Sequence, residues 1–139
     1  MENTRPPIKV VAGLIFRNDQ LLICQRREGA AFALKWEFPG GKVENDEHSA
    51  AALRRELKEE LAIEVRGAEL FAQYEHCYEN GPTVLLQFYR VSDFAGVPQN
   101  LVFQQMLWVD LDELKRFNFL EGDRRLIEQI VGQKDELLQ

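Results

Sequence analysis

A single stretch, residues 40–65, constrains this chain more than any other part of it. It reads GGKVENDEHSAAALRRELKEELAIEV: two glycines, a polar turn, and then a segment rich in Ala, Leu, Arg and Glu that contains no Gly or Pro. These residue types are strong helix formers, so we predict a helix over Ser49–Leu61. Asn45 or Asp46 is the expected cap at its amino end.

Three carboxylates share one face of that predicted helix. Glu56, Glu59 and Glu60 stand at positions i, i+3 and i+4. Like charges at this spacing repel by about 0.2–0.5 kcal/mol per pair, and the helix dipole disfavours anions near the carboxyl end. The arrangement therefore costs stability unless something compensates for it.

Two explanations of this acidic face are open. It can be a solvated surface, softened by Arg54, Arg55 and Lys58. It can also be a binding site for a divalent cation, because Mg2+ and Mn2+ prefer carboxylate, carbonyl and water oxygens. Two features favour the second explanation. The cationic residues do not separate the glutamates, and a glycine pair, whose main chain can approach a ligand closely, precedes the helix.

The spacing of these residues also follows a longer pattern, Gly-x5-Glu-x7-Arg-Glu-aliphatic-x-Glu-Glu-x-Gly-aliphatic. The pattern is met by Gly41, Glu47, Arg55, Glu56, Leu57, Glu59, Glu60 and Ile63. It resembles the signature of the Nudix hydrolases, and the preceding Trp36-Glu37-Phe38-Pro39-Gly40 is similar to the MutT-type branch, which cleaves nucleoside triphosphates. Ala62 replaces the last glycine of the signature, and an alanine in a left-handed cap costs about 1 kcal/mol.

Length and charge limit the possible partners. The 139 residues, 45% hydrophobic and 29% charged, suit one domain, 1–139, in which we expect 1–7 and 133–139 to be flexible. The formal net charge of −6 argues against binding to long nucleic acids or to anionic membranes, which clustered Lys and Arg recognise. A small polyanionic substrate stays compatible, because a metal ion can supply positive charge locally.

The remaining composition favours a cytoplasmic location. Cys24 and Cys77 show no metal-ligand spacing, so we expect reduced, packed thiols. The chain has no apolar run of membrane-spanning length, and its start has no apolar signal-peptide core.

The pattern of strands and helices predicts an α/β layered fold with a mixed sheet. We expect a hairpin of strands 8–16 and 21–25, a second hairpin of strands 63–78 and 83–91, a connection over 92–104 and a short strand at 106–109. A short helix should begin at Asp110 or Asp112, and a last helix should cover 123–131, followed by a polar tail. The resemblance implies a Nudix α/β/α sandwich, in which the motif forms a catalytic loop–helix–loop.

The resemblance also implies roles for individual residues. Glu56, Glu59 and Glu60 match metal-binding glutamates, and Gly40 matches a residue whose carbonyl ligates the metal, Mg2+ or alternatively Mn2+. Glu56 is also a candidate to orient or deprotonate the attacking water. Arg55 and Glu47 are expected to hold the loop–helix–loop together as an ion pair.

One departure from the MutT-type pattern concerns the general base. Relatives commonly carry a further carboxylate before the late Trp-containing strand, whereas residues 101–108 of this chain contain none. Glu44, in the motif loop, is a weak substitute. The identity of the base is therefore open.

The substrate-binding candidates each have a structural alternative. Arg26 and Arg27 can contact substrate phosphates or stay solvated on the surface. Asp123 resembles the position that faces the nucleobase, and it can also cap the last helix. Phe38 can lie beside the base or in the core. We expect His76 to be a strand histidine satisfied by hydrogen bonds, with a substrate-facing role as the alternative.

The leading hypothesis is Mg2+-dependent hydrolysis of a nucleoside triphosphate to the monophosphate and pyrophosphate, including oxidised nucleotides such as 8-oxo-dGTP. One alternative is removal of pyrophosphate from the triphosphorylated 5′ end of RNA. Another is a non-catalytic nucleotide-binding module. The sequence leaves open the substrate base, the number of metal ions and the choice between monomer and homodimer.

Overall fold

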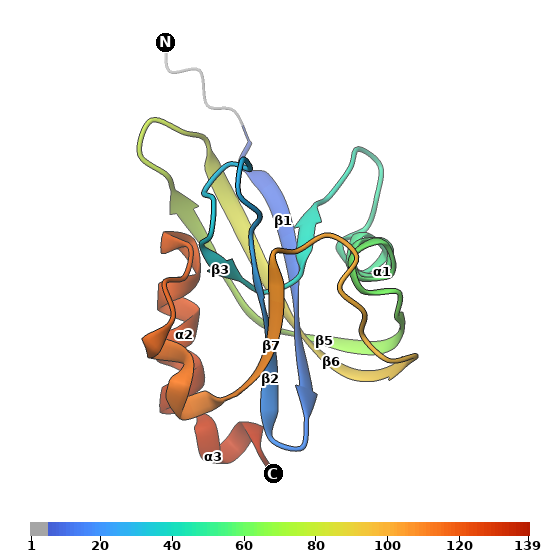
Figure 1. Cartoon of the computed structure of the whole chain (residues 1–139). Coiled ribbons are helices and arrows are strands. Elements are labelled where there is room, and N and C mark those ends of the chain that lie inside the picture. The colour runs from blue at the N-terminus through green and yellow to red at the C-terminus, as the bar shows by residue number, and fades with distance from the viewer. Residues whose placement is uncertain (1–5) are drawn as a thin grey trace.

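A computed structural model describes residues 6–139, and it combines a mixed β-sheet with helices on both sides (Figure 1). Its elements, in chain order, are β1 (Ile8–Arg17), β2 (Gln20–Gln25), β3 (Trp36–Glu37), β4 (Gly40–Lys42), α1 (Ser49–Leu61), β5 (Glu64–Cys77), β6 (Thr83–Ala95), β7 (Gln105–Asp110), the 3-10 helices η1 (Leu111–Arg116) and η2 (Glu121–Asp123), α2 (Arg124–Gly132) and α3 (Lys134–Leu137).

Strand β1 organises the sheet. It runs parallel to β6, from the pair Ile8 and Val84 to the pair Ile15 and Val91, and antiparallel to β2 and β4. Strands β5 and β6 form the long predicted hairpin, and β7 pairs antiparallel with β2. The sheet is therefore mixed, as the sequence predicts.

Two hydrophobic cores lie on opposite faces of the sheet. Alternate residues of a strand point to opposite faces, so β1 contributes Val11 and Ile15 to one core and Ala12 and Leu14 to the other. Helix α1 covers the first core and α2 covers the second, and they stand on opposite sides of the sheet (Figure 1). The predicted α/β/α sandwich is confirmed.

The ends of α1 differ in how well the sequence predicts them. The helix covers Ser49–Leu61 as predicted, but its N-cap residue is His48, without a side-chain capping bond. The prediction of Asn45 or Asp46 as the cap is therefore wrong. Asp46 instead takes a left-handed backbone conformation, with φ 63°, in the turn before the helix. At the other end, Ala62 is left-handed with φ 57°, so the cap geometry persists without a glycine.

Several boundaries in the second half are corrected. Strand β6 continues to Ala95, the helix after β7 is a 3-10 helix, and α2 begins one residue later than predicted, with η2 before it. The predicted polar tail contains α3, whose Leu137 is buried in the α2-side core, and the Leu137 carbonyl accepts a 2.7 Å hydrogen bond from Arg90 Nη2. Within the segment 1–7 that we expected to be flexible, residues 1–5 lie outside the described residues.

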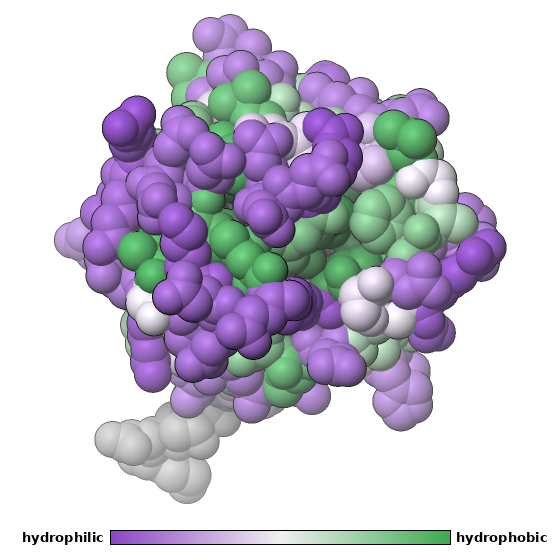
Figure 2. Space-filling view, turned by 90° about the horizontal axis from the view of Figure 1, so that it is seen from below, coloured by the Kyte–Doolittle hydropathy of each residue, from purple (hydrophilic) through white to green (hydrophobic). Residues whose placement is uncertain are grey.

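One end of the molecule has a largely polar surface, as is expected for a chain in which 29% of the residues are charged. The end of the molecule that carries the β1–β2 turn and α3 is mostly hydrophilic, with smaller hydrophobic areas between polar side chains (Figure 2). None of the helices that the structure describes is long and apolar enough to cross a membrane. Cys24 is a buried free thiol, whereas Cys77 is exposed, so the expectation of two packed thiols is wrong for Cys77.

Candidate active site

The two glycines of β4 bring the acidic face of α1 against the sheet. Gly40 lies so close to β1 that a Cβ atom there would be 1.9 Å from the Val11 carbonyl oxygen. A Cβ atom on Gly41 would lie 2.5 Å from the carboxyl carbon of Glu56. The neighbouring backbone therefore requires the first glycine, whereas the second leaves room for the Glu56 carboxyl group.

The three predicted glutamates take different positions around this turn. Glu60 Oε1 accepts a 2.9 Å hydrogen bond from the Gly40 amide. The carboxyl group of Glu56 lies against Gly41, and it accepts a 2.8 Å bond from Arg55 Nη1. The side chain of Glu59 is 59% exposed, and its Oε2 lies 3.5 Å from Arg55 Nη1. Two carboxylates thus face the glycine turn, and the third stands at its solvent side.

The raised pKa values of two of these glutamates indicate that their negative charge is poorly compensated. Burial raises the pKa of Glu60 to about 8; the Gly40 amide lowers it, and the charges of Glu56 and Glu37 raise it further. The pKa of Glu56 is also raised by burial, against the opposing effect of Arg55. A cation beside these oxygens would lower both pKa values and stabilise the ionised carboxylates.

Arg55 fixes the loop before α1 to the helix. Its Nε lies 2.9 Å from Glu47 Oε2, and its Nη2 donates 3.0 Å and 3.1 Å bonds to Glu47 Oε1 and the Lys42 carbonyl. The bonds from Arg55, and then the amide of Glu44, hold the pKa of Glu47 at about 2. The side chain of Glu44 is exposed and lies 3.8 Å from Arg55. The expected ion pair between Arg55 and Glu47 is present.

The donor set suits a divalent metal, although the side chains are not arranged as a finished cage. Across residues 6–139 no three His, Cys, Asp or Glu side chains are grouped closely enough to hold a metal ion as they stand. The carboxylates of Glu56, Glu59 and Glu60 are nevertheless hard oxygen ligands on one rigid helix, and two of them have raised pKa values. The residues present therefore fit Mg2+ or Mn2+ in chemistry.

The loop before β7 reaches the same helix end but brings no acid. The amides of Gln99 and Leu101 donate hydrogen bonds of 2.9 Å and 3.2 Å to the carbonyls of Leu61 and Glu60. The loop thus satisfies carbonyls that end α1. Residues 101–108 contain no carboxylate. The further carboxylate of the MutT-type pattern is therefore missing from a loop that contacts the helix of the three glutamates.

On the other side of the sheet, Asp123 ends η2 and lies only 5% exposed. It occupies the N-cap position of α2, but its side chain makes no capping bond, so only the position fits the predicted capping role. Burial and the charge of Glu37 raise the pKa of Asp123 well above its usual range. Glu37 is a half-buried acid of β3 to which the sequence analysis gave no role, and its only sequence signal is its place in Trp36-Glu37-Phe38-Pro39-Gly40.

Two tyrosines of β5 and the segment after it hold η2 in place. The Tyr74 hydroxyl donates a 2.6 Å bond to the Gly122 carbonyl and accepts one of 3.2 Å from the Leu126 amide. A Cβ on Gly122 would lie 2.6 Å from the Tyr78 hydroxyl oxygen, so a glycine is needed there. These contacts fix the residue that precedes Asp123.

His76 does not have the hydrogen bonds that we expected. Its Nε2 is buried without a partner in the described part of the chain, and its ring meets the Tyr78 ring edge-on at 4.4 Å between centroids. The prediction of a histidine satisfied by hydrogen bonds is therefore wrong for this nitrogen.

The remaining substrate-binding candidates, Phe38, Arg26 and Arg27, lie in different surroundings. Phe38 is 3% exposed and packs between Phe88 and Phe119, at 6.4 Å and 5.3 Å between ring centroids, which is the core alternative. Arg26 Nη1 donates 3.1 Å and 3.2 Å bonds to the two carboxylate oxygens of Glu37. Arg27 is exposed.

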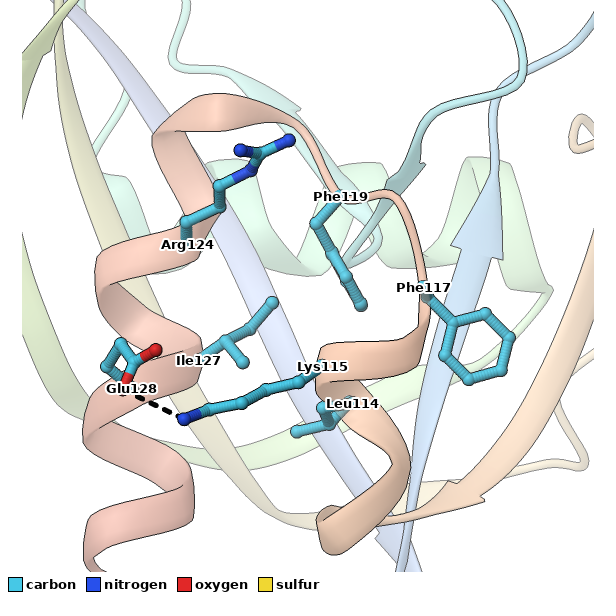
Figure 3. A pocket seen from close by; sticks show the side chains of 7 residues that line it. All are labelled: Leu114, Lys115, Phe117, Phe119, Arg124, Ile127 and Glu128. Atoms are coloured by element: carbon cyan, nitrogen blue, oxygen red, sulfur yellow. Dashed lines mark hydrogen bonds and ion pairs between the residues drawn. The ribbon is translucent and has the colours of Figure 1, made fainter.

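A separate cavity of about 370 Å³ lies between η1 and α2 (Figure 3). It is lined by Leu114, Lys115, Phe117, Phe119, Arg124, Ile127 and Glu128. A 3.0 Å ion pair between Lys115 and Glu128 spans it. Its lining has one acid and two cations, so it lacks the acidic cluster that metal-assisted hydrolysis needs.

Helices on both faces of a mixed sheet, and an acidic helix tied to a glycine turn, are the features that the resemblance to the Nudix hydrolases predicts. The NUDIX domain model matches residues 6–130, and the chain belongs to the Nudix hydrolase family. It is 37% identical over 130 residues to an 8-oxo-dGTP diphosphatase of Haemophilus influenzae, covering 91% of this chain and 93% of that protein.

Two further comparisons agree. The chain is 37% identical over 125 residues to a CTP pyrophosphohydrolase of Escherichia coli, covering 90% of this chain and 92% of that protein. A solved MutT structure, from work on the proteins of Aliivibrio salmonicida and Vibrio cholerae, superposes with a TM-score of 0.80 at 32% identity, covering 92% of this chain and 99% of that one. The resemblance to the MutT-type branch is confirmed.

Proposed function

We propose that this protein hydrolyses a nucleoside triphosphate to the nucleoside monophosphate and pyrophosphate, with Mg2+ as its metal and Mn2+ as a substitute. One observation carries the proposal: the acidic face of α1 lies against the Gly40–Gly41 turn and is held there by Arg55. The names of the relatives support it, since they are a diphosphatase and a pyrophosphohydrolase of nucleoside triphosphates.

The protein would supply the ligands and the geometry for this reaction. Glu56, Glu59, Glu60 and the Gly40 carbonyl would hold the metal. When bound, the metal neutralises charge on the triphosphate and makes a coordinated water more acidic. Glu56 is the candidate to orient or deprotonate the water, because its carboxyl group lies against the turn. Arg55 keeps Glu56 in place and is itself fixed through Glu47.

The nucleobase would bind at the α2 side of the sheet, facing Asp123. The carboxyl group of Asp123 is buried and makes no capping bond to α2, and in this proposal it pairs with the base. A carboxylate accepts hydrogen bonds, and a protonated carboxyl can also donate one. The two relatives name different bases, 8-oxoguanine and cytosine, so the preferred base is part of what has to be measured.

The test is a panel of normal and oxidised nucleoside triphosphates, assayed for pyrophosphate and monophosphate with Mg2+. We expect both products in equal amounts from at least one nucleotide, and we expect Glu56→Gln to abolish the activity. Glu64→Gln, an exposed glutamate just beyond α1, is the matched control and should leave turnover unchanged. No pyrophosphate from any nucleotide, or full activity in Glu56→Gln, would contradict the proposal.

A further inference from the structure

The cavity between η1 and α2 has an apolar floor and takes no part in the proposed reaction. Leu114, Phe119 and Ile127 are buried at this floor, and Ile127 points from α2 into the space between the two helices (Figure 3). Its volume of about 370 Å³ is typical of small-molecule sites, which combine an apolar lining with a few polar groups. Asp123, which we propose to face the base, is not among its lining residues. The cavity is therefore separate from the proposed base site.

Two cationic side chains meet at one edge of this cavity. Lys35 Nζ donates a 3.1 Å hydrogen bond to Asn118 Oδ1, and Arg124 Nη2 donates one of 3.4 Å to the same oxygen. Asn118 stands between Phe117 and Phe119, which both line the cavity. Lys35 belongs to the segment before β3, whereas Arg124 is the first residue of α2. The fold therefore brings together two charges that lie far apart in the sequence.

Neither of these two charges has a carboxylate partner. The ion pairs formed within residues 6–139 include neither Lys35 nor Arg124, although the chain as a whole has a formal net charge of −6. Lys115, the third cation beside the cavity, is already paired with Glu128 at 3.0 Å. The Asn118 oxygen that the two cations share is neutral, so their positive charges repel each other. An anion placed beside them would remove this repulsion.

We propose that the cavity binds a small organic anion, whose apolar body lies on the buried floor and whose phosphate or carboxylate group lies beside Lys35 and Arg124. Arginine and lysine side chains bind both kinds of anion through charge-assisted hydrogen bonds. Glu128 limits the affinity, because it competes with the ligand for Lys115. The site is independent of the proposed function, since the nucleotide substrate is bound elsewhere.

The first experiment tests whether the site recognises both parts of such a ligand. Metal-free protein is titrated with phenyl phosphate, benzoate, inorganic phosphate and phenol in an isothermal titration calorimeter. Phenyl phosphate or benzoate should bind about tenfold more tightly than inorganic phosphate or phenol, because only the first two combine a ring with an anionic group. The tighter of these two probes identifies the preferred acidic group. If neither binds more tightly than inorganic phosphate, the apolar floor contributes nothing and the proposal is wrong.

The second experiment tests the charged residues with the tighter probe. Lys35→Gln and Arg124→Gln should each weaken its binding by about three- to tenfold. Glu128→Gln should instead strengthen binding by about two- to fivefold, because Lys115 is then released to contact the anion. Arg66→Gln removes an exposed positive charge of β5 and is the matched control, which should bind the probe as wild type does.

Three results with these variants would overturn the site. One is unchanged affinity in the double variant Lys35→Gln with Arg124→Gln. The second is an equal loss of affinity in Arg66→Gln, which would indicate general attraction of anions to the surface. The third is a loss of affinity in Asp123→Asn, which would place the probe at the base side. None of these measurements depends on turnover, so a failure of this site and a failure of the proposed function are distinguishable.

Discussion

Replacing Gly41 by alanine would place a methyl group 2.5–2.6 Å from three atoms of the Glu56 carboxyl group. Ordinary van der Waals contact begins at 3.4 Å, so the carboxyl group would have to move by about 1 Å. It lies at the end of a flexible side chain, and Gly41 has no left-handed conformation, so the fold should tolerate the change. A 1 Å displacement of a catalytic group costs about 100-fold in rate.

We therefore expect Gly41→Ala to lose about 100-fold in kcat while its thermal unfolding temperature stays within a few degrees of wild type. The assay is pyrophosphate release with saturating nucleotide and Mg2+, beside differential scanning calorimetry. Gly132→Ala is the matched control, because a Cβ there meets nothing within 4 Å. Gly40→Ala should behave in the opposite way and lose folded protein, because its methyl group would collide with the backbone of β1. Full activity in Gly41→Ala would refute the assigned position of Glu56.

Three further predictions concern stability. The pKa of Glu60 is about 8 in the folded protein, above its unfolded value near 4.5. Metal-free protein should therefore lose stability as the pH rises from about 5 to 8. Urea unfolding should show this decrease in wild type and a smaller one in Glu60→Gln. Ala62→Gly should raise the unfolding free energy by about 1 kcal/mol, because it removes left-handed strain at the end of α1, and no gain in urea unfolding would contradict this. Tyr74→Phe should cost about 1–3 kcal/mol, because it leaves the Gly122 carbonyl and the Leu126 amide without their partner; an unchanged melting temperature would show that these bonds contribute little.

Local features of the sequence were sufficient to predict the bounds of α1, although not its N-cap residue. The helix formers set its bounds, and the resemblance to the Nudix signature, carried by Gly41, Glu47, Arg55 and Glu56, implied the ion pair between Arg55 and Glu47. Local signals were misleading where contacts between distant parts of the chain determine whether a residue is buried. Leu137 stands in a polar segment, yet it is buried because α3 packs against the core that α2 covers.

Contacts between distant segments were beyond the sequence analysis. Arg26 meets Glu37 because β2 pairs with β3, where Gln25 lies opposite Trp36, and that register cannot be read from a two-residue strand. The contact between Phe32 and Tyr78 likewise depends on the left-handed backbone conformation of Phe32. Phenylalanine is not a residue type that indicates such a conformation, so it cannot be predicted from the sequence. These long-range pairs lie on the side of the sheet where we propose that the base binds, whereas the motif supplies the residues that we propose to bind the metal.

The central claim is that the crowded carboxylates of α1 exist to bind a divalent cation. The most direct measurement is a titration of the protein with Mn2+, followed by electron paramagnetic resonance, in wild type and in the double variant Glu56→Gln with Glu60→Gln. We expect saturable binding of Mn2+ in wild type, competition by Mg2+, and loss of that binding in the double variant. Equal Mn2+ affinity in both proteins would contradict it.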